Sequence, residues 1–206
     1  MLFRSADAAV RRDRAADRRI GSSFLFPGVG YGGSCFPKDV KAMMMFASAK
    51  NYEFEILHAV ENVNERQKVR LYAKMKQHFG SLKGKRIAVW GLAFKPKTDD
   101  MREAPAVPLI HALLDAGASV AAFDPEAMKI ARGIFGARVD FEDKSYDALK
   151  GADALALVTE WPEFREPDWS RIKKLMKTPV VFDGRNIYNP EQLRGHGFTY
   201  LSMGRK

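Results

Sequence analysis

The second half of the chain alternates short, continuous apolar runs with stretches of helical period. Five apolar runs predict strands: Arg86–Phe94, Ser119–Asp124, Ala152–Thr159, Pro179–Asp183 and, more weakly, Phe198–Ser202. Two amphipathic stretches predict helices between them: Ala104–Ala116 and Glu126–Phe135. Strands that are apolar throughout and alternate with helices are typical of a parallel sheet covered on both faces. The pattern therefore predicts an α/β fold, with a doubly wound, mostly parallel, Rossmann-like sheet over residues 84–206.

The longest periodic run lies upstream of this sheet. Apolar side chains recur at steps of three and four from Ile56 to Phe79, and Gly80 and Gly84 follow. This pattern predicts one long helix over residues 52–83, about 45 Å for about thirty residues. Such a helix is too long for one face of a compact domain. We therefore expect it to link two domains and to pair with its copy in a homodimer.

Residues 1–51 form a separate predicted region ahead of the long helix. Residues 1–19 are rich in Ala, Arg and Asp without an apolar period, which is typical of a frayed helix or a disordered arm. A loop rich in glycine, proline and aromatic residues is expected over Ile20–Asp39, and a short buried helix over Val40–Lys50.

Composition and charge narrow the class of protein. The 206 residues carry a net charge of +9, but six arginines of the excess lie within residues 1–19, and no basic stripe is interleaved with aromatics. This distribution does not favour nucleic acid and suits a small phosphate-bearing ligand better. A single cysteine excludes an internal disulfide, no apolar run approaches a membrane span, and no signal peptide is evident. We therefore expect a cytoplasmic protein without a membrane partner.

The one cysteine lies in an unusual local sequence, Gly30-Tyr31-Gly32-Gly33-Ser34-Cys35-Phe36-Pro37-Lys38-Asp39. Three glycines in four positions allow backbone conformations with positive φ and close approach of a substrate. Lys38 can favour the reactive thiolate, and Asp39 can act as a general base or orient one. A lone cysteine is more often a small buried hydrophobe. The flanking residues favour a nucleophile here.

Charged residues follow the predicted strands, where ligands of such sheets bind. Only Gly91 stands where a dinucleotide fold has G-x-G-x-x-G, so we do not expect this sheet to hold an NAD pyrophosphate. Asp124 closes the second strand, and we interpret it as a turn residue rather than a ribose ligand. The positive charge and hydrogen-bond donors of Lys95 and Arg102 suit the binding of a diphosphate, and we interpret Lys97 as a solvated loop residue. Arg185 could meet a phosphate or form a surface ion pair, and the pattern leaves both open.

The four histidines give no further site. They lie far apart in the sequence, without metal-ligand spacing or a Ser/His/Asp order: His58, His78, His111 and His196. We expect no metal.

At this point the residues resemble a known family. Four blocks, in order and spacing, are similar to the UDP-glucose branch of the nucleotide-sugar 6-dehydrogenases: 24–39, Gly91–Pro96 with 98–103, Thr159–Trp161 and Asp183–Asn186. The match runs from about Arg19 to Ser202. Cys-Phe-Pro-Lys-Asp at 35–39 is similar to the UDP-glucose members, whereas GDP-mannose enzymes tend to carry Leu after the Cys, and N-acetylhexosamine enzymes depart at the Lys-Asp pair.

The resemblance implies an activity and site roles. A sugar C6 alcohol would be oxidised to a carboxylate with two NAD⁺, through a thiohemiacetal and a thioester on Cys35, for polysaccharide biosynthesis. Asp39 matches a carboxylate that positions water or a base. Two residues match cofactor contacts: Lys38 and Arg102. The others match substrate contacts, Arg19 reaching the substrate of the neighbouring subunit: Arg19, Phe24, Leu25, Gly28, Val29, Gly30, Tyr31, Gly32, Phe94, Lys95 and Arg185.

The chain departs from the family pattern upstream. Family members begin with an NAD-binding Rossmann domain carrying G-x-G-x-x-G, which is not found before Cys35, and residues 1–18 do not match the family segment. We therefore expect a C-terminal portion that is inactive alone or is completed by another polypeptide. Three alternatives stay open: a GDP-mannose enzyme, a UDP-N-acetylhexosamine enzyme, and a nucleotide-sugar binding module with a vestigial Cys35.

Overall fold

A six-stranded, all-parallel sheet forms the centre of the molecule; five of its strands lie in the predicted apolar runs, and β3 Asp140–Phe141 was not predicted. The computed structural model describes residues 16–19 and 27–205. The strands stand in the order β3-β2-β1-β4-β5-β6. Their bounds are β1 Arg86–Trp90, β2 Ser119–Phe123, β3 Asp140–Phe141, β4 Ala154–Leu157, β5 Val180–Asp183 and β6 Thr199–Ser202. The α/β fold with a doubly wound parallel sheet is confirmed.

Helices cover both faces of this sheet. The α-helices are α2 Phe36–Ser48, α3 Glu55–Lys68, α4 Arg70–Phe79, α5 Ala106–Asp115, α6 Met128–Phe135, α7 Trp169–Leu175 and α8 Pro190–Gly195. Within residues 27–205, short 3₁₀ turns lie at Gly136–Arg138, Asp147–Leu149 and Pro162–Phe164. The strand order reverses between β1 and β4, which makes the crevice beyond their carboxyl ends the expected ligand site.

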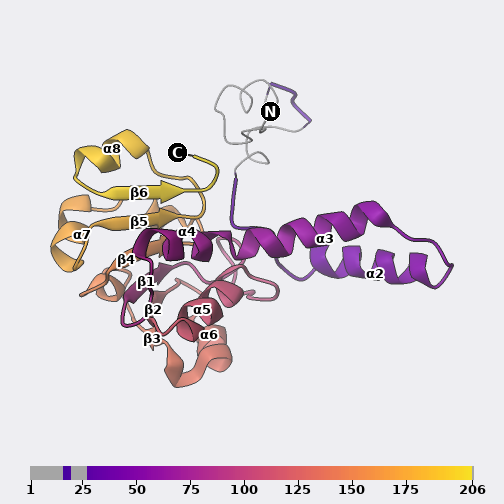
Figure 1. Cartoon of the computed structure of the whole chain (residues 1–206), viewed down its shortest axis with the longest axis horizontal. Helices are drawn as coiled ribbons and strands as arrows, with labels where there is room; N and C mark the ends of the chain where they lie inside the picture. The colour runs from indigo at the N-terminus through magenta and orange to yellow at the C-terminus, as the bar shows by residue number, and fades with distance from the viewer. Residues whose placement is uncertain (1–15, 20–26, 206) are drawn as a thin grey trace.

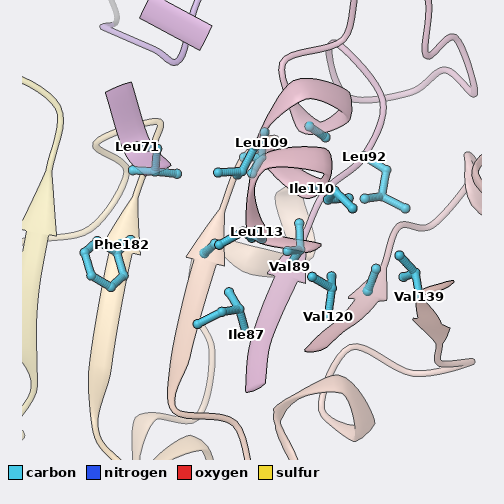
Figure 2. Packing of buried hydrophobic residues seen from close by; sticks show 14 of the residues in the cluster. Leu71, Ile87, Val89, Leu92, Leu109, Ile110, Leu113, Val120, Val139 and Phe182 are labelled. Carbon is cyan, nitrogen blue, oxygen red and sulfur yellow. The ribbon is translucent and has the colours of Figure 1, made fainter. Parts of the chain in front are cut away.

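Alternate residues of each strand enter two hydrophobic cores, one per face. Ile87 and Val89 point into a core with helices α4, α5 and α6, which includes the fully buried Leu71 and Leu113 (Figure 2). Their neighbours in β1, Ala88 and Trp90, enter the opposite core, with Trp169 and Ile172 of α7. Because helices cover both faces of the sheet, the strands are apolar on both faces.

The predicted long helix is two helices. Val69, with φ −96° and ψ 0°, separates α3 from α4. Leu71 and Met75 of α4 are fully buried against the sheet, whereas Ile56 and Val63 of α3 are 66% and 55% exposed. The two helices therefore have different surroundings, and a single amphipathic stripe does not describe them. The division of the chain at residues 51 and 83 stays a prediction.

Helix α2 also differs from its prediction. It begins at Phe36, four residues before the predicted start at Val40, because Pro37 suits the first turn of a helix. It is largely exposed rather than buried: Met45 and Phe46 are 74% and 72% exposed. In Figure 1, α2 and α3 form a hairpin that projects from the part of the molecule that contains the sheet.

Candidate functional site

The carboxyl ends of β1 and β4 lie tightly against each other. Gly91 follows β1 with φ +88°, and a Cβ there would lie 2.5 Å from Thr159 Cβ and 2.6 Å from Thr159 N. The Thr159 hydroxyl donates to Ala93 O at 2.6 Å. Only glycine fits this turn, which explains why Gly91 stands at the strand end.

Asp124, at the end of β2, is a structural residue. It is 1% exposed, and its two carboxylate oxygens accept from four backbone N–H groups and from the Trp161 indole: Leu92, Ala93, Glu126, Ala127 and Trp161. With its acceptor sites committed, Asp124 has no role left as a ribose ligand. Together with the lone Gly91, this means that the described residues of β1 and β2 do not fit an NAD dinucleotide.

The glycine-rich loop before Cys35 is fastened to α3. Gln67 Nε2 donates to Gly28 O at 2.6 Å, while Asn64 Oδ1 accepts from Tyr31 N at 2.8 Å and its Nδ2 donates to Tyr31 O at 3.2 Å. The Val29 side chain is 1% exposed and belongs to the hydrophobic core, so it anchors the loop instead of facing a ligand. Asn64 and Gln67 are functional candidates that sequence reasoning missed. Two amide side chains three positions apart within an apolar helical stripe were the available signal.

A cavity of about 710 Å³ lies between this loop, α3 and the end of β5. Six of the predicted substrate contacts line it: Gly28, Gly30, Tyr31, Gly32, Phe94 and Arg185. Helix α3 supplies the opposite wall, with Ile56, Ala59, Val60 and Val63. The cavity therefore has a polar end at Arg185 and a wide apolar wall. Its size suits a small-molecule ligand.

Arg185 stands at the polar end and is held by a carboxylate. Its Nη2 donates to Glu160 Oε1 at 2.6 Å, and its Nε lies 2.6 Å from Glu160 Oε2. A Cβ on Gly28 would lie 2.5 Å from Arg185 Nη1, so the guanidinium rests against the glycine loop. Asp183, fully buried, accepts from Arg185 N at 2.8 Å and fixes the turn after β5. Arg185 thus forms the ion pair that the sequence left open, and it also lines the cavity; its contact with a phosphate stays a prediction.

Cys35 is exposed and sits at the N-terminal end of α2. Its Sγ lies 3.6 Å from Ser34 Oγ, and its backbone O accepts from Asp39 N at 2.9 Å, which starts the helix. The positive end of the helix dipole favours negative charge at this position. An accessible thiol at a helix N-terminus is the arrangement that a nucleophilic cysteine requires.

Each charged residue near Cys35 has an opposite charge beside it. Lys38 Nζ lies 3.5 Å from Asp39 Oδ1, and both side chains are exposed. Arg102 donates through Nε and Nη2 to Asp100, each at 2.9 Å. This hydrogen-bonded pair lowers the pKa of Asp100 and raises that of Arg102. Arg102 is therefore a paired cation, and its backbone O accepts from Gly33 N in the loop before Cys35.

The other predicted site residues lie apart from the cavity wall or outside the described residues. Lys95 Nζ lies 5.2 Å from the centroid of the Phe94 ring, and Arg19 pairs with Asp17 at 2.6 Å, exposed to solvent. Phe24 and Leu25 are not among the described residues. In the part of the chain that the structure describes, no group of three or more His, Cys, Asp or Glu side chains could hold a metal ion. The same residues include no helix long and apolar enough to cross a bilayer.

Comparison with known proteins gives a consistent result. Residues 88–190 match the UDP binding domain of the UDP-glucose/GDP-mannose dehydrogenase family, and residues 6–66 match its central domain. A UDP-glucose 6-dehydrogenase of Pseudomonas aeruginosa is 47% identical over 202 residues, covering 95% of this chain and 45% of that protein. A UDP-glucose 6-dehydrogenase of Bacillus subtilis is 43% identical over 92% of this chain and 41% of its own length.

Solved structures agree with the sequence relatives. A UDP-glucose dehydrogenase from Pyrobaculum islandicum superposes with a TM-score of 0.79 at 34% identity, over 89% of this chain and 41% of that one. An NDP-N-acetyl-D-galactosaminuronic acid dehydrogenase from Methanosarcina mazei gives a TM-score of 0.80 at 26% identity, over 96% and 44%. The chain spans about half the length of the relatives it matches. Two domain models in their family order, with the glycine loop of one facing the sheet of the other, show that the chain belongs to the UDP-glucose/GDP-mannose dehydrogenase family.

Proposed function

We propose that this chain carries the nucleotide-sugar site and the cysteine nucleophile of a UDP-glucose 6-dehydrogenase, which oxidises UDP-glucose to UDP-glucuronate with two NAD⁺. One observation carries the proposal: the glycine loop, Phe94 and Arg185 converge on one cavity, at the edge of a sheet that matches a UDP binding domain. The names of the relatives support UDP-glucose as the substrate.

The cavity offers the groups that a nucleotide diphosphate needs. The backbone at Gly28–Gly32 lets phosphate oxygens approach closely, and Arg185 supplies a fork of N–H donors at the end of β5. Because Glu160 already offsets the charge of Arg185, the diphosphate must accept hydrogen bonds from the loop backbone as well as from the guanidinium. The sugar then extends from the phosphates toward Cys35 along the same loop.

Cys35 acts on the sugar aldehyde. The sulfur forms a bond to C6, the carbonyl electron pair moves to oxygen, and that oxygen takes up the proton that the thiol releases, which gives a thiohemiacetal. Asp39 positions the water or base that later frees the product, while Lys38 and Arg102 would contact the cofactor. When bound, NAD⁺ would accept the hydride. The described residues of β1 and β2 do not fit it, so no hydride step is assigned to them.

Two other functions also have a specific observation in their favour. A GDP-mannose or UDP-N-acetylhexosamine enzyme shares the fold, since relatives acting on N-acetyl sugars superpose as well. A non-catalytic nucleotide-sugar binding module would need the cavity but not Cys35. The exposed thiol at a helix N-terminus favours the enzyme.

Titration calorimetry with UDP and UDP-glucose tests the site. Arg185→Ala removes a charge-assisted hydrogen bond of about 1.5–3 kcal/mol, so we expect affinity to fall roughly tenfold to a hundredfold. Lys97→Ala is the matched control: Lys97 is exposed and does not line the cavity, and it should change little. Equal weakening by both variants would mean general electrostatic attraction. An unchanged affinity in Arg185→Ala would move the site elsewhere, and tighter binding of GDP than of UDP would favour the GDP-mannose alternative.

We also propose that the chain forms a homodimer through α3. Ile56 and Val63 are 66% and 55% exposed on the same helix, and they line the apolar wall of the cavity. A second copy of α3 would bury the part of this apolar surface that a nucleotide sugar in the cavity leaves uncovered.

A further inference from the structure

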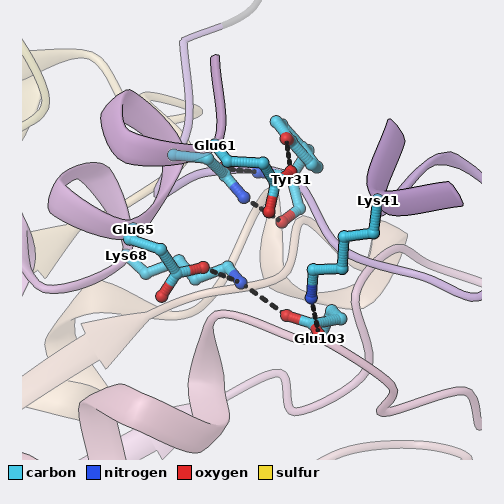
Figure 3. Close-up of polar contacts among 7 residues, drawn as sticks. Tyr31, Lys41, Glu61, Glu65, Lys68 and Glu103 are labelled. Carbon is cyan, nitrogen blue, oxygen red and sulfur yellow. Dashed lines mark hydrogen bonds and ion pairs between the residues drawn. The ribbon is translucent and has the colours of Figure 1, made fainter. Parts of the chain in front are cut away.

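Lys68 is a charged side chain buried at the meeting point of three elements. It is 4% exposed, and its Nζ lies 2.8 Å from Glu65 Oε1 of α3 and 2.9 Å from Glu103 Oε2 (Figure 3). Glu103 belongs to the turn that leads from β1 into α5. A buried ammonium is tolerated only with close counter-charges, so Lys68 fixes where the Glu103 carboxylate must stand.

The protonation states of this cluster are well defined. Burial acts to lower the pKa of Lys68, but its hydrogen bonds with Glu65 and Glu103 outweigh burial and raise it. Hydrogen bonds from Lys41 and Lys68 lower the pKa of Glu103 to about 2. Both groups are therefore charged at neutral pH, and the cluster does not switch there.

Glu103 connects this cluster to the helix that carries Cys35. Its second oxygen, Oε1, accepts from Lys41 Nζ of α2 at 2.6 Å. The backbone of the same turn holds the loop before the cysteine: Arg102 O accepts from Gly33 N at 2.8 Å, and a Cβ on Gly32 would lie 2.4 Å from Glu103 O. Both flanks of Cys35 are thus fastened to residues 102–103.

The backbone of Glu103 gives independent support. Its φ is +54°, a left-handed conformation that is unfavourable for a residue with a side chain and persists only when its surroundings enforce it. Glu103 therefore differs from a residue in an ordinary surface ion pair, because two lysines hold it in this backbone conformation at the candidate site.

We propose that Lys68 is a positioning residue for Cys35: through Glu103 it holds both the glycine loop and the start of α2 against the nucleotide-binding sheet. The purpose of this positioning rests on the proposed function, because attack requires sulfur and carbon about 3–3.5 Å apart, and a shift of about 1 Å costs about a hundredfold in rate. The positioning itself does not depend on which substrate binds.

Spin labelling tests the proposal directly, since Cys35 is the only cysteine in the sequence. A nitroxide on Cys35 reports the mobility of the loop by electron paramagnetic resonance. We expect Lys68→Met to add a mobile component to the spectrum, and Lys68→Arg to restore the immobilised one. Lys85→Met is the control, because Lys85 also pairs with a buried carboxylate, Asp153, but lies at the opposite end of β1. An immobilised spectrum in folded Lys68→Met, or equal mobility in Lys85→Met, would overturn the proposal.

Glu103→Gln covers the case in which Lys68→Met fails to fold, as circular dichroism would reveal. It leaves Lys68 its partner Glu65 and should also mobilise the label; an unchanged spectrum there would overturn the proposal too. Calorimetry with UDP on the same proteins separates the two hypotheses. If the wild type does not bind UDP, the proposed function fails, while the label still reports whether Lys68 holds Cys35.

Discussion

At the scale of single residues, the candidate site is built from cations that are already paired. Arg185 faces Glu160, Arg102 faces Asp100, and Lys38 faces Asp39. Such pairs hold a guanidinium in a fixed direction and leave little net positive charge. Under the proposed function, selectivity for a diphosphate would therefore come from geometry: fixed donors beside a glycine backbone that a ligand can approach.

Substitution of Gly91 tests how closely the ends of β1 and β4 must approach each other. Gly91→Ala adds a Cβ 2.5 Å from Thr159 at a φ of +88°, and we expect a loss of about 2–4 kcal/mol in the free energy of unfolding, from strain and overpacking together. Gly133→Ala is the matched control. Gly133 lies within α6 with nothing within 4 Å of an added Cβ, so alanine should stabilise the protein by about 0.5–1 kcal/mol. Urea unfolding of both variants measures the two changes, and effects of the same sign would contradict the argument.

Glu103 gives a pH dependence of stability. Its pKa falls from an ordinary 4.5 to about 2 in the folded protein, mainly because Lys41 and then Lys68 donate to it. The folded state thus binds a proton less readily than the unfolded state. The stabilisation is complete above about pH 4.5 and is lost as the pH falls toward 2. Urea unfolding at pH 6, 4 and 3 should show a smaller acid loss in Glu103→Gln than in the wild type. Asp147→Asn removes a carboxyl whose pKa is lowered mainly by one exposed lysine, Lys150, instead of two, and should reduce the acid loss less than Glu103→Gln does.

At the scale of elements, α3 acts as the support of the substrate loop. Its polar side chains Asn64 and Gln67 bind the loop backbone, while Lys68 reaches the turn after β1. One helix thereby connects the two segments that the family match assigns to different domains. The loop has little regular structure of its own, so its shape depends on these side-chain contacts.

Asn64→Ala tests this support. Asn64 is 4% exposed, and its loss leaves the Tyr31 N–H and C=O without their partners. We expect a cost of about 1–3 kcal/mol in unfolding free energy, together with weaker UDP binding in calorimetry. The exposed Asn62, two positions earlier in α3, is the matched control, and Asn62→Ala should alter neither quantity. A fall in stability without any change in UDP affinity would separate the loop from the binding site.

Elements whose burial repeats with a clear period were predictable from the sequence. The strands β1, β2, β4 and β5 and the helices α5 and α6 came from apolar runs, because each packs against the core on a fixed face. Strand β3 has two residues, and α7 and α8 have seven and six, too short for a period to emerge. Their signals were local: Asp168 and Asn189 cap α7 and α8 with side-chain hydrogen bonds.

The site was predictable only where residue type itself implies chemistry. The glycine loop and Arg185 lie on one cavity, as glycine content and strand ends indicate, and Phe94, which only the family resemblance implied, lines the same cavity. Glu160, Asn64 and Lys68 were missed because their roles depend on contacts between residues 25 to 35 positions apart. The break at Val69 was missed because the three-and-four pattern continues through it.

At the scale of the whole molecule, the α2–α3 hairpin exposes more apolar surface than a monomer needs. Large side chains on both helices are more than half exposed: Phe36, Met43, Met45, Phe46, Ile56 and Val63. The sheet and its covering helices bury their own cores completely, so the hairpin adds nothing to them. Large apolar side chains exposed on two neighbouring helices are candidates for burial in an interface between proteins.

The proposed homodimer predicts which part of this surface is covered. Val63→Asp places a charge on the α3 face, where burial against a second copy would leave it without a partner, so the dimer should dissociate in sedimentation velocity at tens of micromolar. Met45→Asp introduces the same charge on α2, at a side chain that is 74% exposed, and should leave the dimer intact. A wild-type protein that sediments as a monomer would refute the dimer. Dissociation by Met45→Asp alone would transfer the interface to α2, because Met45 and Phe46 are the most exposed large apolar side chains among the described residues.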